Sequence, residues 1–127
     1  MKHDTFTEAY IECALWSSTD QSDEQGGDPL DKNYDESDIA TKTLATMVAD
    51  CARFQQEQAA DLALAKYEAQ WTDAEMAGHD FWLTRNGHGA GFWDRGLGKV
   101  GDRLSDASKA FGSFELYIGG DGKIHGA

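Results

Sequence analysis

The chain has 127 residues, the length of one domain, and 40% of them are hydrophobic, which excludes a fully disordered chain. Its formal net charge of −12 disfavours direct binding to nucleic acid, because contacts with phosphates need Lys and Arg. No apolar run reaches the roughly 20 residues that span a bilayer, and the first ten residues, MKHDTFTEAY, lack the basic and apolar regions of a signal peptide. We therefore expect a single cytoplasmic domain, residues 1–127, with no membrane partner.

The negative charge is concentrated in the N-terminal part of the chain. Residues 1–78 hold 17 acidic and 5 basic side chains, a net of −12, whereas residues 79–127 hold 6 of each. Solubility is the simplest explanation of this excess. Attraction to a basic protein surface is the more specific explanation.

Helices are expected on both sides of an acidic segment. A helix is predicted over residues 5–17, where Thr5 and Glu8 stand at capping-box spacing before apolar residues at helical intervals. A second helical pattern runs over residues 37–70. Because so many residues would reach roughly 50 Å, a break near residues 57–61 is expected.

The two cysteines fall in these helical stretches. Cys13 lies in the first pattern and Cys51 in the second. In a chain without a signal peptide, buried thiols are favoured over a disulfide.

The acidic segment between the helices, residues 17–38, is predicted to be a long exposed loop. It contains eight acids, one Lys, the only proline and no hydrophobic period. Leu30 and Tyr34 are expected to hold it to the body of the protein. Because carboxylates at this density attract Lys and Arg, the loop is the predicted partner-binding region. Its candidate residues are Asp20, Asp23, Glu24, Asp28, Asp31, Asp35, Glu36 and Asp38.

The hydrophobic period changes after Gly78. Thr72 and Glu75 repeat the capping-box spacing and open a short helix that Gly78 is expected to end. The following stretch, DFWLTR, alternates between apolar and polar residues. Residues 79–95 are therefore predicted to form a β-hairpin around an Asn-Gly turn, with Phe81 opposite Phe92 and Trp82 over a glycine.

The rest of the chain completes an α+β fold. A helix is predicted with its cap near Asp102 and its end at Gly112, followed by a hairpin with an Asp121-Gly122 turn. The expected architecture is a set of N-terminal helices packed on an antiparallel sheet of about four strands, which the two hairpins form.

The first predicted hairpin also carries candidate ligand-binding residues. The glycines of NGHGAG could expose backbone N–H groups to a phosphate, with Arg85 or Arg95 completing the site. A small hydrolase using His88 and Asp94 is a further alternative, but no nucleophile stands beside a base, so no catalytic activity is expected. Two tryptophans that share a face could form a stacking platform. The candidates are Trp82, Arg85, Asn86, His88, Trp93, Asp94 and Arg95.

No metal or cofactor is expected from the spacing of potential ligands. Neither cysteine stands in a C-x-x-C pair, and His79 and His88 are too far apart for a zinc motif. The acids of the loop do not have the spacing of an EF-hand.

The run HDFWLTRNGHGAGFWDRGLG, taken with AYIECALWSS, DPLDKNYDESDIA and LYIGGDGKIH, resembles a family of small acidic proteins encoded by bacteriophages and prophages. The likeness covers nearly the whole chain in the same order, although the loop between Trp16 and Pro29 is longer and more acidic than the resemblance leads one to expect. It implies the cytoplasm of a bacterial host as the setting, and no particular activity.

Small acidic phage proteins often inhibit host enzymes by occupying basic nucleic-acid channels as DNA mimics, and anti-restriction and anti-CRISPR proteins are familiar examples. The chain resembles those examples in type and not in sequence. The expected function is therefore inhibition of a host nucleic-acid-binding or defence protein through the acidic residues of the N-terminal part. A binding module for a small phosphorylated ligand is the alternative.

Overall fold

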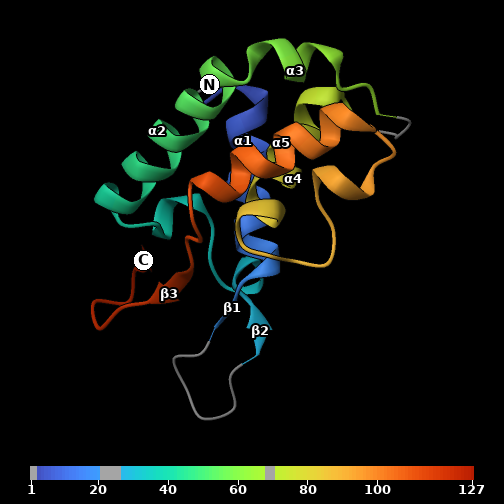
Figure 1. The fold of residues 1–127 in the computed structure, drawn as a ribbon. Coiled ribbons are helices and arrows are strands. Elements are labelled where there is room, and N and C mark those ends of the chain that lie inside the picture. The colour runs from blue at the N-terminus through green and yellow to red at the C-terminus, as the bar shows by residue number, and fades with distance from the viewer. Residues whose placement is uncertain (1–2, 21–26, 68–70) are drawn as a thin grey trace.

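The fold is mainly helical in a computed structural model that describes residues 3–20, 27–67 and 71–127 (Figure 1). Two small antiparallel sheets, β1–β2 and β3–β4, have two strands each. The elements are α1 Thr5–Ser17, β1 Thr19–Asp20, β2 Asp28–Pro29, the 3-10 turns η1 Leu30–Lys32 and η2 Glu36–Asp38, α2 Thr41–Glu57, α3 Ala59–Leu64, α4 Asp73–Arg85, the 3-10 turn η3 Phe92–Asp94, α5 Lys99–Ala110, β3 Leu116–Ile118 and β4 Ile124–Gly126.

The first predicted helix is confirmed as α1, with a different cap. Asp4, and not Thr5, is the N-cap, and its carboxylate accepts the backbone N–H of Thr7 at 2.8 Å. Eight of the thirteen residues of α1 are buried, because the helix packs against α4, α2 and η1. It is the central helix of the fold.

The predicted β-hairpin over residues 79–95 is wrong, because DFWLTR forms the last turns of α4. The helix begins at the predicted capping box, where Thr72 and Glu75 exchange hydrogen bonds, but it continues through Gly78 to Arg85. Nine of its thirteen residues are buried. A helix surrounded by the rest of the protein needs no polar face, so this stretch lacks the 3.6-residue period that identifies a helix in a sequence. The described residues consequently form no four-stranded sheet.

Gly78 allows α4 to cross α1 at close range. A Cβ atom built at this position would overlap the backbone carbonyl oxygen of Phe6. We expect Gly78→Ala to lower the free energy of unfolding by about 1–3 kcal/mol, because the two helices would have to separate. Urea denaturation measures this loss.

The control for that prediction is Gly89→Ala. Gly89 lies in the exposed loop after α4, where an added Cβ has open space. This variant should unfold at the same urea concentration as the wild type. Equal losses from the two substitutions would contradict the close helix crossing.

The second helical pattern breaks at the expected place. Gln58 ends α2, and the short helix α3 follows it directly. The start of α2 is four residues later than predicted, because residues 36–38 form the separate turn η2, which is capped by Asp35.

The described part of the acidic segment contains short strands and 3-10 turns where the sequence predicted a loop. Strand β1 pairs with β2, Thr19 opposite Pro29 and Asp20 opposite Asp28, and this pair projects from the lower end of the molecule (Figure 1). The side chain of Leu30 is fully buried and that of Tyr34 packs on the core, so both anchoring predictions are confirmed. Residues 21–26, including Asp23 and Glu24, lie outside the described residues.

The C-terminal elements follow the prediction with one shift. Helix α5 begins at Lys99, three residues before the predicted cap at Asp102, and Gly112 follows its end with a φ of 76°. The second hairpin is confirmed as β3–β4, and Gly122 has a φ of 79° in its turn. A backbone hydrogen bond connects this hairpin to the start of α2, where the Ala40 N–H donates to the Ile124 carbonyl at 2.8 Å.

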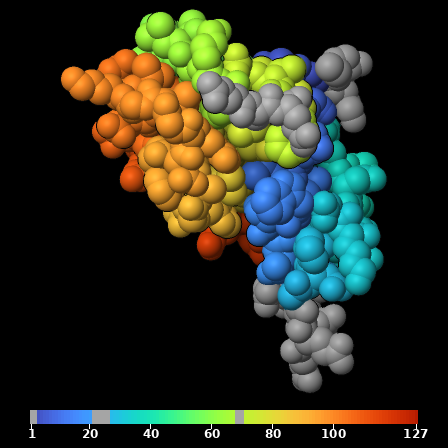
Figure 2. Space-filling view, turned by 90° about the vertical axis from the view of Figure 1, so that its right-hand side faces the viewer, coloured from blue at the N-terminus to red at the C-terminus, as the bar shows by residue number. Residues whose placement is uncertain are grey.

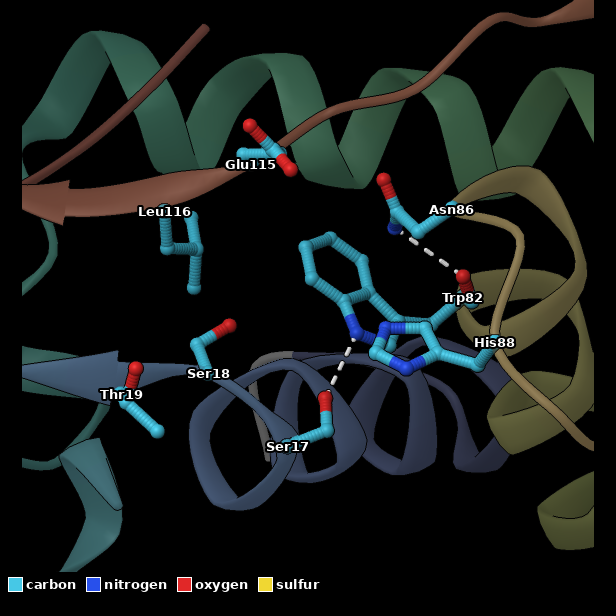
Figure 3. Close-up of a pocket in the computed structure, with 8 residues that line it drawn as sticks. All are labelled: Ser17, Ser18, Thr19, Trp82, Asn86, His88, Glu115 and Leu116. Atoms are coloured by element: carbon cyan, nitrogen blue, oxygen red, sulfur yellow. Dashed lines mark hydrogen bonds between the residues drawn. The ribbon is translucent and has the colours of Figure 1, made fainter. Parts of the chain in front are cut away.

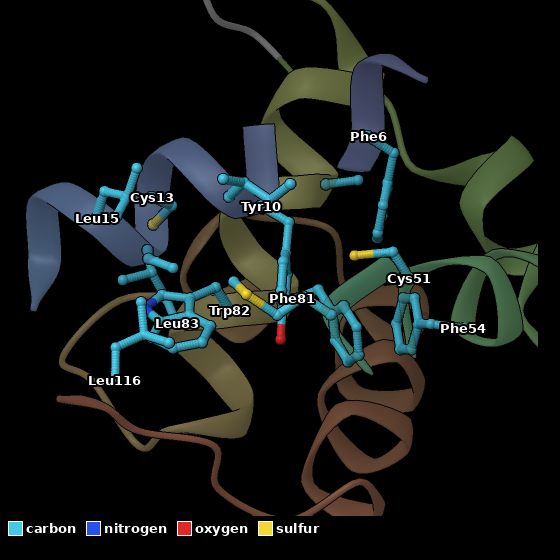
Figure 4. Close-up of a cluster of buried hydrophobic side chains, with 14 of the residues drawn as sticks. Phe6, Tyr10, Cys13, Leu15, Cys51, Phe54, Phe81, Trp82, Leu83 and Leu116 are labelled. Carbon is cyan, nitrogen blue, oxygen red and sulfur yellow. The ribbon is translucent and has the colours of Figure 1, made fainter. Parts of the chain in front are cut away.

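Aromatic rings fill the centre of the core (Figure 4). Phe54 of α2 stacks on Phe81 of α4 with ring centroids 4.1 Å apart. Cys13 and Cys51 are buried free thiols, as predicted. Burial raises the pKa of Cys13 to about 12 and also raises the pKa of Cys51, so both thiols stay protonated at neutral pH.

Candidate functional site

The predicted partner-binding acids belong to the segment of residues 19–38, which we call the acidic arm, and six of the eight lie in its described part. Asp28, Asp31 and Asp35 are exposed, while Asp20, Glu36 and Asp38 are partly buried. The described part of the arm lies at the lower right edge of the molecule in the space-filling view (Figure 2).

Local hydrogen bonds hold the carboxylates of Asp35 and Asp38 in place. The Asp35 side chain accepts the Ser37 N–H at 2.9 Å, and the Asp38 side chain accepts the Asp35 N–H at 2.9 Å. With Leu30 buried beneath them, these turns present negative charge from a folded support. The described part of the arm, residues 19–20 and 27–38, therefore presents its charge from a folded backbone.

Each of the four arginines forms an ion pair with a carboxylate of the same chain. For Arg85 and Arg95, whose side chains are largely buried, these bonds leave little of the guanidinium for an external phosphate. Lys32 and Lys66 are also paired, with Asp28 and Asp73. The arginine pairs are Arg53–Glu57, Arg85–Asp50, Arg95–Asp80 and Arg103–Asp61.

Arg95 forms an ion pair with a buried carboxylate. It binds Asp80 of α4 with two nitrogens, Nη2 to Oδ1 at 2.8 Å and Nε to Oδ2 at 3.2 Å, and Asp80 is 0% exposed. Tyr67 completes the group, because its hydroxyl donates to Asp80 at 2.9 Å. The hydrogen bond to Asp80 raises the pKa of Arg95, and burial beside this charge raises the pKa of Tyr67. The pair ties the loop after η3 to α4.

The Arg85 side chain is also buried and bonded within the protein. Its guanidinium uses four of its five N–H groups, on the Asp50 carboxylate at 2.9 Å, the Tyr10 hydroxyl at 3.1 Å, and two backbone carbonyls after α5. Burial raises the pKa of Tyr10, which remains protonated. The structure therefore does not bring Arg85 and Arg95 together as a phosphate site.

Three of the predicted ligand-binding residues do meet, in a cleft of about 320 Å³ (Figure 3). The cleft lies between the end of α1, β1, the end of α4 and β3. Its described lining contains one carboxylate and one imidazole but no Lys or Arg. The lining residues are Ser17, Ser18, Thr19, Trp82, Asn86, His88, Glu115 and Leu116.

The floor of this cleft is built by structural hydrogen bonds. The Trp82 indole N–H donates to the Ser17 hydroxyl at 2.8 Å, and the Asn86 side chain accepts the Phe114 N–H at 2.8 Å. His88 and Glu115 are exposed at the rim. The polar rim suits a ligand with hydrogen-bond donors or positive charge better than a phosphate.

Three stretches that lie far apart in the sequence converge on the cleft. Ser17 belongs to AYIECALWSS, His88 to the long central run, and Leu116 to LYIGGDGKIH. Sequence reasoning missed Ser17 and Glu115 as neighbours of Trp82, because no local pattern reports a contact across 65 residues.

The remaining predicted residues lie apart from the cleft. Trp82 is 2% exposed, whereas Trp93 of η3 is about half exposed, so the predicted stacking platform is not formed. Asp94 is exposed on η3 and is not among the residues that line the cleft with His88. His79, predicted opposite Asp94, instead contacts the Trp71 ring, and burial lowers its pKa.

Comparisons of this chain with protein-family models, with curated proteins and with solved structures give no match. Among the described residues, no helix has both the length and the apolar character needed to cross a bilayer.

Proposed function

We propose that this protein binds a host nucleic-acid-binding or defence protein in the bacterial cytoplasm and inhibits it by presenting the acidic arm to a basic surface. The observation that supports the proposal most is the separation of charge within the fold. The arm contains eight acids and one Lys, while the arginines are paired with carboxylates elsewhere.

The electrostatics of the arm favour a basic protein as the partner. Charges at this density accelerate encounter with a complementary surface, and salt screens the attraction beyond a Debye length of about 8 Å at physiological ionic strength. Because Leu30 anchors a folded backbone, less conformational entropy is lost on binding than for a flexible tail.

The cleft lies at the root of the arm and supports the same class of partner. Thr19 of β1 lines it, and Glu115 stands at its rim. Hydroxyl and carboxylate oxygens accept hydrogen bonds from a Lys or Arg side chain, whereas a phosphate would meet the Glu115 carboxylate without an opposing Lys or Arg. The phosphorylated-ligand alternative is therefore the weaker one.

The proposal is tested with an octa-arginine peptide as a defined basic partner and two matched triple variants. One removes three of the eight negative charges of the arm, and the other removes three negative charges from exposed positions in the C-terminal part. Asn retains the oxygen that caps η2 at position 35. The variants are Asp28→Asn/Asp31→Asn/Asp35→Asn and Asp94→Asn/Asp102→Asn/Asp106→Asn.

Stopped-flow binding at 50 to 300 mM salt is the measurement. We expect the arm variant to associate several-fold more slowly and with a flatter salt dependence, and the C-terminal variant to stay close to the wild type. Equal effects from the two variants would mean that net charge alone drives binding, and would contradict a role for the arm. Matching urea denaturation curves exclude unfolding as the cause.

A further inference from the structure

Three side chains with metal-ligating atoms meet where the start of the described chain touches the end of the acidic arm. His3 precedes α1, Glu8 lies in its first turn, and Glu36 begins η2. One ring nitrogen and one carboxylate oxygen from each Glu all lie within 4.8 Å of one another. The closest pair is His3 Nε2 and Glu36 Oε2, at 2.9 Å.

This group is shielded from solvent. The His3 side chain is 10% exposed and that of Glu36 is 20% exposed, and the Oε1 atom of Glu8 is buried. Two carboxylates that converge in such a place repel each other, and burial weakens their solvation. A divalent cation placed among these atoms would attract both carboxylates and accept the lone pair of the imidazole.

The types of ligand indicate the class of cation. One imidazole nitrogen and two carboxylate oxygens suit Zn²⁺, which binds such atoms at about 2.0–2.2 Å and often keeps a water as the fourth ligand. Tetrahedral ligands at these lengths stand about 3.3 Å apart, which lies within the range of separations found here. Mg²⁺ and Ca²⁺ prefer oxygen alone.

We propose that His3, Glu8 and Glu36 form a binding site for a divalent transition-metal ion of the Zn²⁺ class. The ion would fasten η2 to the start of α1 and so fix the end of the acidic arm. The spacing of residues in the sequence gave no indication of a metal, because the three ligands come from separate segments. This site does not depend on the proposed function.

The test is calorimetric titration of the full chain with ZnCl₂, together with the thermal midpoint of unfolding. We expect one Zn²⁺ per chain and a raised midpoint, with MgCl₂ leaving the midpoint unchanged. His3→Ala and Glu36→Gln should each weaken Zn²⁺ binding at least tenfold. Glu8→Gln provides a third variant in case His3→Ala fails to fold.

The matched control is His125→Ala. His125 and Asp121 form an exposed pair at 3.0 Å with the same imidazole–carboxylate chemistry but without a third ligand. This variant should bind Zn²⁺ as the wild type does. Absence of Zn²⁺ binding by the wild type, unchanged binding by folded His3→Ala or Glu36→Gln, or loss of binding in His125→Ala would overturn the site.

Discussion

Arg95→Ala should lower the free energy of unfolding by about 3–5 kcal/mol, because it leaves the buried Asp80 carboxylate without its guanidinium. The size of the stability loss depends on Asp80, which is fully buried. Among the described residues, its remaining side-chain partner would be the Tyr67 hydroxyl. Urea denaturation monitored by circular dichroism measures the change. Adding Asp80→Asn to the same chain should recover part of the lost stability, since it removes the stranded charge.

Arg103→Ala is the matched control for that prediction. Arg103 holds Asp61 in the same two-nitrogen geometry, with Nη2 to Oδ1 at 2.8 Å and Nε to Oδ2 at 2.9 Å, but on the surface. Exposed ion pairs contribute little, so this variant should be far less affected than Arg95→Ala. Similar losses from the two substitutions would show that burial of Asp80 does not decide the effect.

Phe54→Ala should cost a similar amount, about 3–5 kcal/mol, because it opens a cavity where three helices meet. The Phe54 side chain is fully buried, its ring stacks on Phe81, and its centroid lies about 6 Å from those of Phe6, Phe92 and Phe111. The measurement is again the free energy of unfolding in urea.

Trp16→Ala tests whether the position of the aromatic ring matters. Trp16 is 50% exposed at the end of α1, so its removal should change stability by about 0.5 kcal/mol or less. If Phe54→Ala lowered the free energy of unfolding no more than Trp16→Ala, the placement of Phe54 at the centre of the core would be contradicted.

The fold was predictable from the sequence wherever the signal was local. The extent of α1, the break at Gln58, the capping box at Thr72 and the C-terminal hairpin all depend on residues within a few positions of each other. The second half of α4 was not predictable in this way. Its side chains are buried on all sides, and a fully buried helix lacks the polar face that reveals a helical period.

The candidate site shows the same division. Charge density along the chain located the acidic arm, since exposed acids need no long-range partner to stay on the surface. Nothing in the sequence showed that Arg85 would meet Asp50 or that Arg95 would meet Asp80. The phosphate site predicted from the sequence assumed that arginines near glycines are available to a ligand, whereas both are paired with carboxylates in the fold.

Binding of a basic host protein by the acidic arm is tested most directly by capture from bacterial cells. The bait proteins are the tagged wild type, the arm variant and the C-terminal variant, and the captured proteins are eluted with duplex DNA and quantified. We expect a protein with a basic nucleic-acid-binding surface to be retained by the wild type and the C-terminal variant, lost from the arm variant and released by DNA. Retention of the same protein by the arm variant, or its resistance to duplex DNA, would contradict the account.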